Sequence, residues 1–230
     1  MTKLDIFIEG ENVDLCIPTL EFAKTSEWYS WFNNPHITAH TKYGQFPNTR
    51  EKQEEFFLAN HAAQRLMLIV TNKDNEPLGT VSIANINHQT RSGVLAIIFG
   101  KFFRKNPLEA LEAVALITEH AFLQLGLNRI IGGQHINLIQ WSQRMSLLGY
   151  RVEGIEKNGF VKGREIADMI NIACHYEDFQ TITKNRNGTI WDSQEKMLQR
   201  IKSLPKIPFH KLLQDFMKDS NSYYQNIFNL

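Results

Sequence analysis

Short runs of alternating apolar and polar residues stand at the beginning and in the middle of the chain. The opening segments "DIFIEG" and "VDLCIP" alternate in this way and predict a pair of short strands. Three apolar runs follow at residues 66–70, 78–86 and 93–99, and the turn-forming clusters "TNKDNEP" and "NHQTRSG" separate them. This pattern predicts an antiparallel meander.

Apolar residues at helical spacing predict helices before and after the meander. One helix is expected over residues 19–32, where "NNP" ends it, and a second begins after Thr49, a good N-cap. A central helix runs from about residue 107 to 125, with proline at its first position and Gly126 after its end. The segment "NLIQWSQRMSLLGY" predicts another helix, which Gly149 ends.

Two more strand segments complete the predicted fold. "NRIIGGQHI" reads as a strand, and "YRVEGIEKNGFVKGREIADMINIAC" as a closing hairpin. The order of antiparallel strands, helix, strand, helix and strand pair predicts an α/β (α+β) fold, with a mixed, mostly antiparallel sheet flanked by helices.

The chain divides into a predicted domain at residues 1–176 and a helical C-terminal extension at residues 177–230. Helices are expected in the extension at residues 193–204 and 209–218, separated by the breaker "PKIP". An apolar stripe at helical spacing can dock on its own domain, on a second copy in a homodimer, or on another protein. Its residues are Phe209, Leu212, Leu213, Phe216 and Met217.

Composition and charge exclude several classes of protein. Among 230 residues the formal net charge is only +1, so no overall field favours nucleic acid or an anionic membrane. No apolar stretch approaches the roughly 20 residues that span a bilayer, and the opening does not resemble a signal peptide. A cytoplasmic location is expected. Cys16 and Cys174 lie far apart without metal-ligand neighbours, so both are expected to be buried hydrophobes.

Five segments together resemble one known family. They are "WFNNPHI", "LGTVSIANINHQTRSG", "GLNRIIGGQHIN", "LLGYRVEG" and "GREIADM". In this order and spacing, over residues 8–174, they resemble the GNAT superfamily of acyl-CoA-dependent N-acyltransferases. Within it they are similar to the branch that holds ribosomal-protein N-terminal and amino-sugar N-acetyltransferases. The resemblance implies acetyl-CoA as acyl donor, no metal, and direct attack of an amine on the thioester.

The segment "GKFFRKNPLEALEA" occupies the place of the family's pyrophosphate-binding loop. The family pattern there, R/Q-x-x-G-x-G/A, is degenerate in this chain, because Lys105 and Pro107 replace the two glycines. Arg104 and Lys105 can bind phosphate oxygens through charge-assisted bonds, and Asn106 can adopt the left-handed turn. The alternative is a solvated basic corner in a member of the family that has lost catalysis.

The resemblance also implies contacts along the rest of the donor. The strand at residues 96–100 borders the pantetheine arm and polarises the thioester carbonyl through a backbone N–H, which makes Ile97, Ile98 and Phe99 candidates for donor binding. Asn137 lies where family members often have an asparagine that contacts the arm.

The catalytic groups are less clear in this chain than in the family. The tyrosine that often protonates the leaving thiolate is replaced by Met145, so Ser142, Ser146 or water would serve. His135, at the end of a predicted strand, is the candidate base, and a structural role for it is the alternative.

By resemblance, the acceptor is bound by the first helices and their linker. Trp31, His36, His40 and Tyr43 offer aromatic faces and polar groups that suit a sugar ring or a nucleotide. His88, in a predicted turn, is either a further acceptor contact or a solvated residue.

Three function classes remain open. The first is an N-acetyltransferase for a small amine, with an amino-sugar nucleotide of surface polysaccharide synthesis as the preferred acceptor. The second is an acetyltransferase for a protein N-terminus, and the third is a non-catalytic binding protein that has kept the fold.

Overall fold

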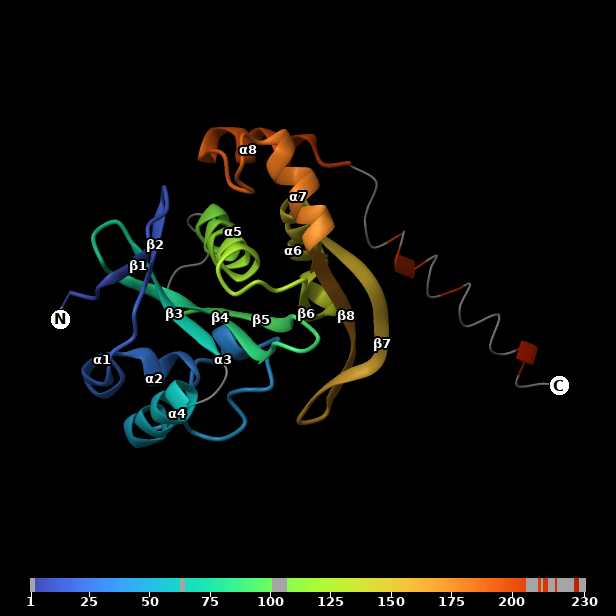
Figure 1. Cartoon of the computed structure of the whole chain (residues 1–230). Helices are drawn as coiled ribbons and strands as arrows, with labels where there is room; N and C mark the ends of the chain where they lie inside the picture. Colours follow the sequence, from blue (N-terminus) through green and yellow to red (C-terminus); the bar gives the residue numbers. More distant parts are fainter. Residues whose placement is uncertain are drawn as a thin grey trace.

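A computed structural model of the chain describes residues 3–62, 65–100 and 107–205, together with residues 211, 213, 214, 218, 226 and 227. In this part of the chain eight strands form one sheet in the order β1-β2-β3-β4-β5-β6-β8-β7 (Figure 1). The strands are β1 (Ile6–Ile8), β2 (Val13–Cys16), β3 (Leu66–Asn72), β4 (Pro77–Asn87), β5 (Ser92–Phe99), β6 (Arg129–His135), β7 (Tyr150–Lys162) and β8 (Glu165–His175). Among these described strands, β5 and β6 alone pair in parallel. The expected mixed, mostly antiparallel sheet is confirmed.

Helices cover both faces of this sheet (Figure 1). They are α1 (Leu20–Thr25), α2 (Trp28–Trp31), α3 (Pro35–Thr38), α4 (Arg50–Ala62), α5 (Pro107–Leu123), α6 (Ile139–Met145), α7 (Tyr176–Asn185) and α8 (Gln194–Ser203). Along β3, Met67 and Ile69 face the apolar cluster of α1, α2 and α4, whereas Leu68 and Val70 face the larger cluster around α5. The alternation in the sequence therefore serves two cores, one on each face.

Two helical predictions need correction. The expected helix at residues 19–32 is two helices, because Ser26 is extended (φ −81°, ψ 173°) and its Oγ accepts a hydrogen bond from the Trp28 N–H at 3.2 Å. A serine whose side chain accepts a hydrogen bond from a nearby backbone N–H can end one helix and begin the next.

Helix α7 was not predicted. The helix expected at 193–204 is confirmed, with Ser193 as its N-cap. The helix expected at 209–218 lies almost wholly outside the described residues, and the homodimer through it stays a prediction.

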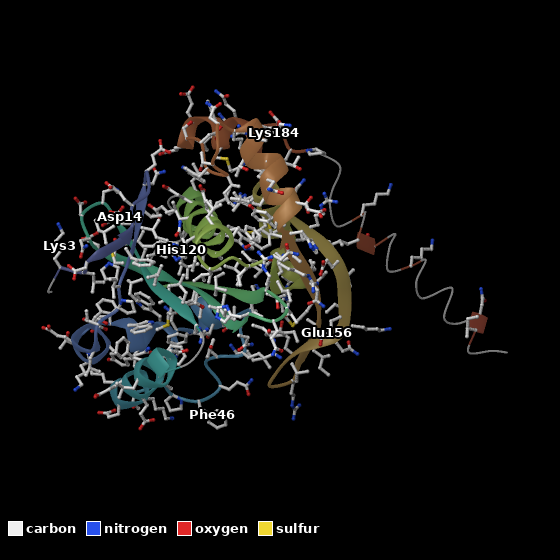
Figure 2. All side chains as sticks on the ribbon, in the orientation of Figure 1. Lys3, Asp14, Phe46, His120, Glu156 and Lys184 are labelled. Carbon is white, nitrogen blue, oxygen red and sulfur yellow. The ribbon has the colours of Figure 1, made fainter. Side chains whose placement is uncertain are left out.

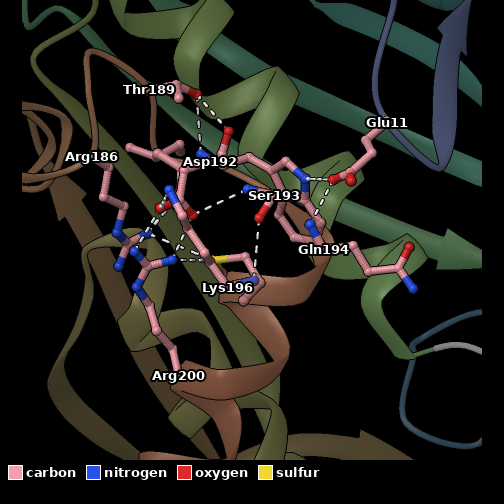
Figure 3. Close-up of polar contacts among 11 residues, drawn as sticks. Glu11, Arg186, Thr189, Asp192, Ser193, Gln194, Lys196 and Arg200 are labelled. Carbon is pink, nitrogen blue, oxygen red and sulfur yellow. Dashed lines mark hydrogen bonds and ion pairs between the residues drawn. The ribbon is translucent and has the colours of Figure 1, made fainter.

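The C-terminal segment packs on the same core as α5. Phe179, Ile190 and Met197 belong to the larger apolar cluster. Glu11 in the β1–β2 turn accepts hydrogen bonds from the Trp191 indole N–H at 3.0 Å and from the Gln194 N–H at 2.6 Å (Figure 3). These contacts hold the part of the predicted extension that ends with α8 against the sheet. The division into two parts at residue 176 stays a prediction.

Glu112, a fully buried residue on α5, also holds the β1–β2 turn in place. It accepts hydrogen bonds from the Glu11 N–H, and from the Asn12 N–H at 3.0 Å and Asn12 Nδ2 at 2.8 Å. We expect Glu112→Ala to lower the free energy of unfolding by about 2–4 kcal/mol, because the N–H groups of the β1–β2 turn lose a buried, charged acceptor. Urea unfolding measures this loss. Glu55→Ala, at an exposed position of α4, is the control, and an equal effect of both variants would contradict the prediction.

Both cysteines are buried, as expected. Burial raises the pKa of the Cys174 thiol to about 12 and that of the Cys16 thiol above its ordinary value. These groups are therefore protonated at neutral pH and pack as small hydrophobic side chains.

Candidate active site

The sheet opens between its two parallel strands. β5 and β6 pair only from Ser92 with Arg129 to Val94 with Ile131. Beyond that point β5 stays with β4, whereas β6 stays with β8, so the two strands diverge. A cavity of about 630 Å³, here called the gap cavity, lies at the open end of β5. Its walls are Asn34, His36, Ile37, His40 and Thr41 around α3, Ile97, Ile98, Phe99 and Gly100 at the end of β5, Ala110 of α5, and Leu138 and Trp141 around the start of α6.

The end of β5 turns main-chain groups toward this gap. The Gly100 N–H donates to the Leu78 carbonyl on the β4 side at 2.7 Å. Because main-chain groups of an antiparallel strand alternate in direction, those of Ile98 also face β4, and those of Ile97 and Phe99 face the gap. An extended ligand in the gap can therefore pair with β5 as an added strand would.

Gly100 is required by the ring that packs against it. A Cβ on Gly100 would lie 2.2 Å from two atoms of the Trp31 indole. Trp31, expected to contact the acceptor, is instead buried against the strand end and is not a wall of the gap cavity.

We expect Gly100→Ala to lower the free energy of unfolding by about 1–3 kcal/mol, because the added methyl group overpacks this contact. It should also weaken ligand binding in the gap, since β5 or Trp31 must shift. Gly154→Ala is the control, because a Cβ there meets no atom within 4 Å. Chemical denaturation of both variants measures the difference, and wild-type stability of Gly100→Ala would refute this account of the strand end.

Two histidines stack beside the gap. The His135 ring, 1% exposed, lies 4.5 Å from the His40 ring, centroid to centroid, with the Phe160 ring 4.6 Å away at a steep angle. His135 Nδ1 accepts a hydrogen bond from the Asn137 N–H at 3.1 Å, and Nε2 lies 3.3 Å from Glu165 Oε1. With Nδ1 as acceptor, the neutral ring carries its proton on Nε2.

The two rings are therefore suited to different tasks. The acceptor lone pair of His135 is already used by a backbone N–H, and His135 does not line the gap cavity. His40 lines the cavity, and burial, followed by the neighbouring His135, lowers the pKa of its imidazole. A neutral imidazole at neutral pH can accept a proton.

The remaining predicted residues divide between this site and other places. His36, Ile97, Ile98 and Phe99 line the gap cavity, and their roles in binding stay predictions. Asn137 is exposed in the short 3₁₀ turn η1 (Ile136–Leu138) that follows β6.

Three predicted residues lie away from the cavity. Ser142 is buried and does not line it. His88 is exposed in the turn that joins β4 to β5, at the opposite end of this hairpin from the Gly79–Phe99 pair beside the gap. Tyr43 lines a separate, smaller pocket.

Arg104, Lys105 and Asn106 lie outside the described residues. Helix α5 begins directly after them, and Ala110 in its first turns lines the cavity. Sequence reasoning missed Trp141 and Leu138 as cavity walls. The aromatic residue just after the strand "NRIIGGQHI" was the available signal.

Within the described ranges, no group of three or more His, Cys, Asp or Glu side chains is arranged to hold a metal ion. None of the described helices is both long and apolar enough to cross a membrane.

A sheet that opens between two parallel strands beside a helix start can hold an extended ligand that carries a phosphate group. The chain belongs to the GNAT acetyltransferase family, because the family described as "Acetyltransferase (GNAT) domain" matches residues 14–137. It is thus an acyl-CoA-dependent N-acetyltransferase. A search of curated proteins finds no match in sequence.

Solved structures share this fold at low sequence identity. A chimera of the spermidine N-acetyltransferase SpeG from Vibrio cholerae and hSSAT is 13% identical, with a TM-score of 0.66 over 74% of this chain and 99% of that one. RimL, a ribosomal L7/L12 alpha-N-protein acetyltransferase in complex with coenzyme A, is 11% identical, with a TM-score of 0.65 over 74% and 98%. The microcin C7 self immunity acetyltransferase MccE, in complex with acetyl-CoA and AMP, is 16% identical, with a TM-score of 0.61 over 72% and 93%.

Proposed function

We propose that the chain acetylates the primary amine of a small polar molecule, with an amino-sugar nucleotide as the preferred acceptor, and that His40 is the base. The observation that carries this proposal is the position of His40, which lines the gap cavity together with the end of β5 and whose pKa is lowered by burial.

Acetyl-CoA supplies an acetyl thioester. The main-chain N–H group of Ile97 faces the gap and can donate to the acyl oxygen, where negative charge grows in the transition state. Arg104, Lys105 and Asn106, by sequence, would hold the diphosphate at the start of α5.

His40 accepts a proton from the acceptor's ammonium group, which frees the lone pair for attack. The C–N bond forms as the C–S bond breaks. The nitrogen then loses a second proton and the departing sulfur gains one, so that one proton is released overall. Ser142 is buried and does not line the cavity, so it is poorly placed to donate the proton that the departing sulfur gains. Because a thiol has a pKa of only about 8.5, the sulfur can take this proton from water. His135 positions His40 through the ring stack.

The chemistry of the walls bears on the acceptor. In the part of the chain that the structure describes, no Asp or Glu lines the gap cavity. SpeG is named a spermidine N-acetyltransferase, and a polyamine would call for carboxylates. Carboxylates gather instead in another cavity, lined by Glu9, Glu11, Glu112, Glu119 and Asp192 beside the C-terminal segment. This arrangement favours a neutral or anionic acceptor.

A protein N-terminus fits less well. Such an acceptor requires an extended groove between the residues around α3 and the β7–β8 hairpin. Lys162 Nζ donates a hydrogen bond to the Thr38 carbonyl at 2.6 Å across this place, which joins the two walls.

Two measurements test the proposal. Calorimetric titration should give acetyl-CoA a micromolar Kd, and absence of binding would favour a non-catalytic protein. A thiol-release assay over amino-sugar nucleotides, free amino sugars, polyamines and short peptides then identifies the acceptor. Turnover confined to peptides would overturn the proposed acceptor class.

A further inference from the structure

A second pocket, of about 190 Å³, lies between α2, α4 and the loop that joins α3 to α4. Its walls include four aromatic side chains, Phe32, Tyr43, Phe46 and Phe56. We call it the aromatic pocket. The Tyr43 ring stands edge-on to the Phe32 ring at 4.9 Å between centroids, which suits a flat ligand laid against either of them.

Gln53 adds a buried polar side chain to these apolar walls. It lines the aromatic pocket and is only 1% exposed. Its Oε1 accepts a hydrogen bond from Asn48 Nδ2 at 3.0 Å, whereas its Nε2 is buried without a partner among the described residues. Because an unpaired buried N–H is costly, a ligand that brings a hydrogen-bond acceptor to this amide gains binding free energy.

The loop that forms the pocket is fixed in place before any ligand arrives. Asn33 Nδ2 donates to the Asn48 carbonyl and the Asn48 N–H donates to Asn33 Oδ1, both at 2.7 Å. Gly44 has φ +82°, and a Cβ there would lie 2.5 Å from Thr38 Oγ1, so the turn requires glycine.

Phe46 and Tyr43 form the rim of the pocket. Phe46 is 80% exposed and lies at the outer edge of the molecule, on the loop before α4 (Figure 2), and Tyr43 is 46% exposed. Two large aromatic rings with this exposure, set around a preformed pocket, are typical of a surface that a ligand covers.

The aromatic pocket and the gap cavity are lined by residues that lie close together in the chain. Thr41 lines the gap cavity and Tyr43 lines the aromatic pocket. The Cα atoms of Thr41 and Tyr43 are at most about 7 Å apart, because they are separated by two residue steps. A molecule of moderate size is therefore long enough to contact both cavities. Within the described residues, neither space is lined by a carboxylate, which argues against a cationic ligand.

We propose that the aromatic pocket binds the non-reacting end of the acceptor, a flat heterocycle with a carbonyl or ring nitrogen at its edge, as in a nucleobase. The ring lies against Phe32, Tyr43 and Phe46, its edge accepts a hydrogen bond from Gln53 Nε2, and the amine extends toward His40. This proposal rests on the proposed function, because the pocket serves the acceptor of that reaction.

Direct binding tests the pocket without relying on turnover. The probes are the four ribonucleoside monophosphates AMP, CMP, GMP and UMP, with ribose 5-phosphate as the ring-free reference, titrated calorimetrically against the full chain. We expect at least one nucleotide to bind about ten-fold or more tightly than ribose 5-phosphate, since stacking on aromatic side chains favours the ring. The proposal fails if all four bind no more tightly than the reference.

Two variants assign the binding to this pocket. Gln53→Met keeps the length of the side chain and removes the amide, and Phe46→Ala removes an exposed ring without touching the core. Each should raise the nucleotide Kd by about five- to ten-fold and leave that of ribose 5-phosphate unchanged. Leu58→Ala, at an exposed position of α4, is the matched control and should change neither Kd. Unchanged nucleotide affinity in Phe46→Ala, which does not depend on the fold of the core, would overturn the proposal.

The failure of this inference is distinguishable from failure of the proposed function. His40→Gln should lower turnover by about 10²- to 10⁴-fold and keep nucleotide binding. If nucleotides bind in the pocket and no amine is acetylated, the pocket stands and the proposed reaction is lost. If amines are acetylated and nucleotides bind no better than ribose 5-phosphate, the reaction stands and the pocket assignment is lost.

Discussion

His40→Gln is expected to lower kcat by about 10²- to 10⁴-fold, the usual contribution of a general base, while the Kd for acetyl-CoA changes little. Glutamine keeps the polarity of the side chain and cannot take up the proton. Steady-state kinetics with the acceptor identified by thiol release, together with calorimetry, measure both quantities. His88→Gln is the control, because the structure places His88 at the far end of the β4–β5 hairpin.

The pH profile gives an independent test of the same residue. Burial and the nearby His135 lower the pKa of His40 below its ordinary value of 6.5, so the neutral base form persists to pH values below 6.5. The acidic limb of kcat/KM in the wild type should therefore lie below pH 6.5 and disappear in His40→Gln. A variant that keeps both the wild-type rate and this limb would show that another group accepts the proton.

The second large effect is expected at the start of α5. Reversing both charges in Arg104→Glu/Lys105→Glu should raise the Kd for acetyl-CoA by about 10²- to 10⁴-fold, because two charge-assisted bonds to phosphate are replaced by repulsion. Calorimetric titration measures the change, and circular dichroism verifies that the fold is retained.

The control for this variant carries the same change in net charge. Lys184→Glu/Lys202→Glu alters exposed residues of α7 and α8, on the C-terminal segment (Lys184 is labelled in Figure 2). It should bind acetyl-CoA as the wild type does. Equal affinity of both double variants for acetyl-CoA would show that Arg104 and Lys105 do not bind the donor. Binding of the donor would then depend on the β5 edge alone.

Several features of the fold follow from local sequence. The meander is predictable because apolar side chains at every second position can serve a core only as strands. Thr49 and Ser193 mark helix starts through their side-chain oxygens, as the hydrogen bonds to Lys52 and Lys196 confirm. Gly126 and Gly149 mark ends because both adopt positive φ.

The break at Ser26 could not be predicted in the same way. The residues around it have acceptable helical spacing, and the choice between one helix and two depends on how Trp28 packs among Phe22 and Phe56. Packing of this kind overrides local preference, which amounts to tenths of a kcal/mol per residue. Helix α7 was missed for a related reason, since the apolar side that docks on Phe122 is short.

The sequence by itself determined the order of strands and helices, the resemblance to GNAT acetyltransferases, and the strand end and basic corner where the donor is expected. It also named both histidines beside the gap, and only the tertiary structure distinguished them. The Asn137 N–H occupies Nδ1 of His135 and Glu165 Oε1 lies 3.3 Å from its Nε2, whereas the His40 ring lines the cavity. Glu165 comes from the β7–β8 hairpin, thirty positions beyond His135 in the sequence. Local pattern cannot supply such a contact, because the hydrogen-bond partners of a side chain are decided when distant segments pack together.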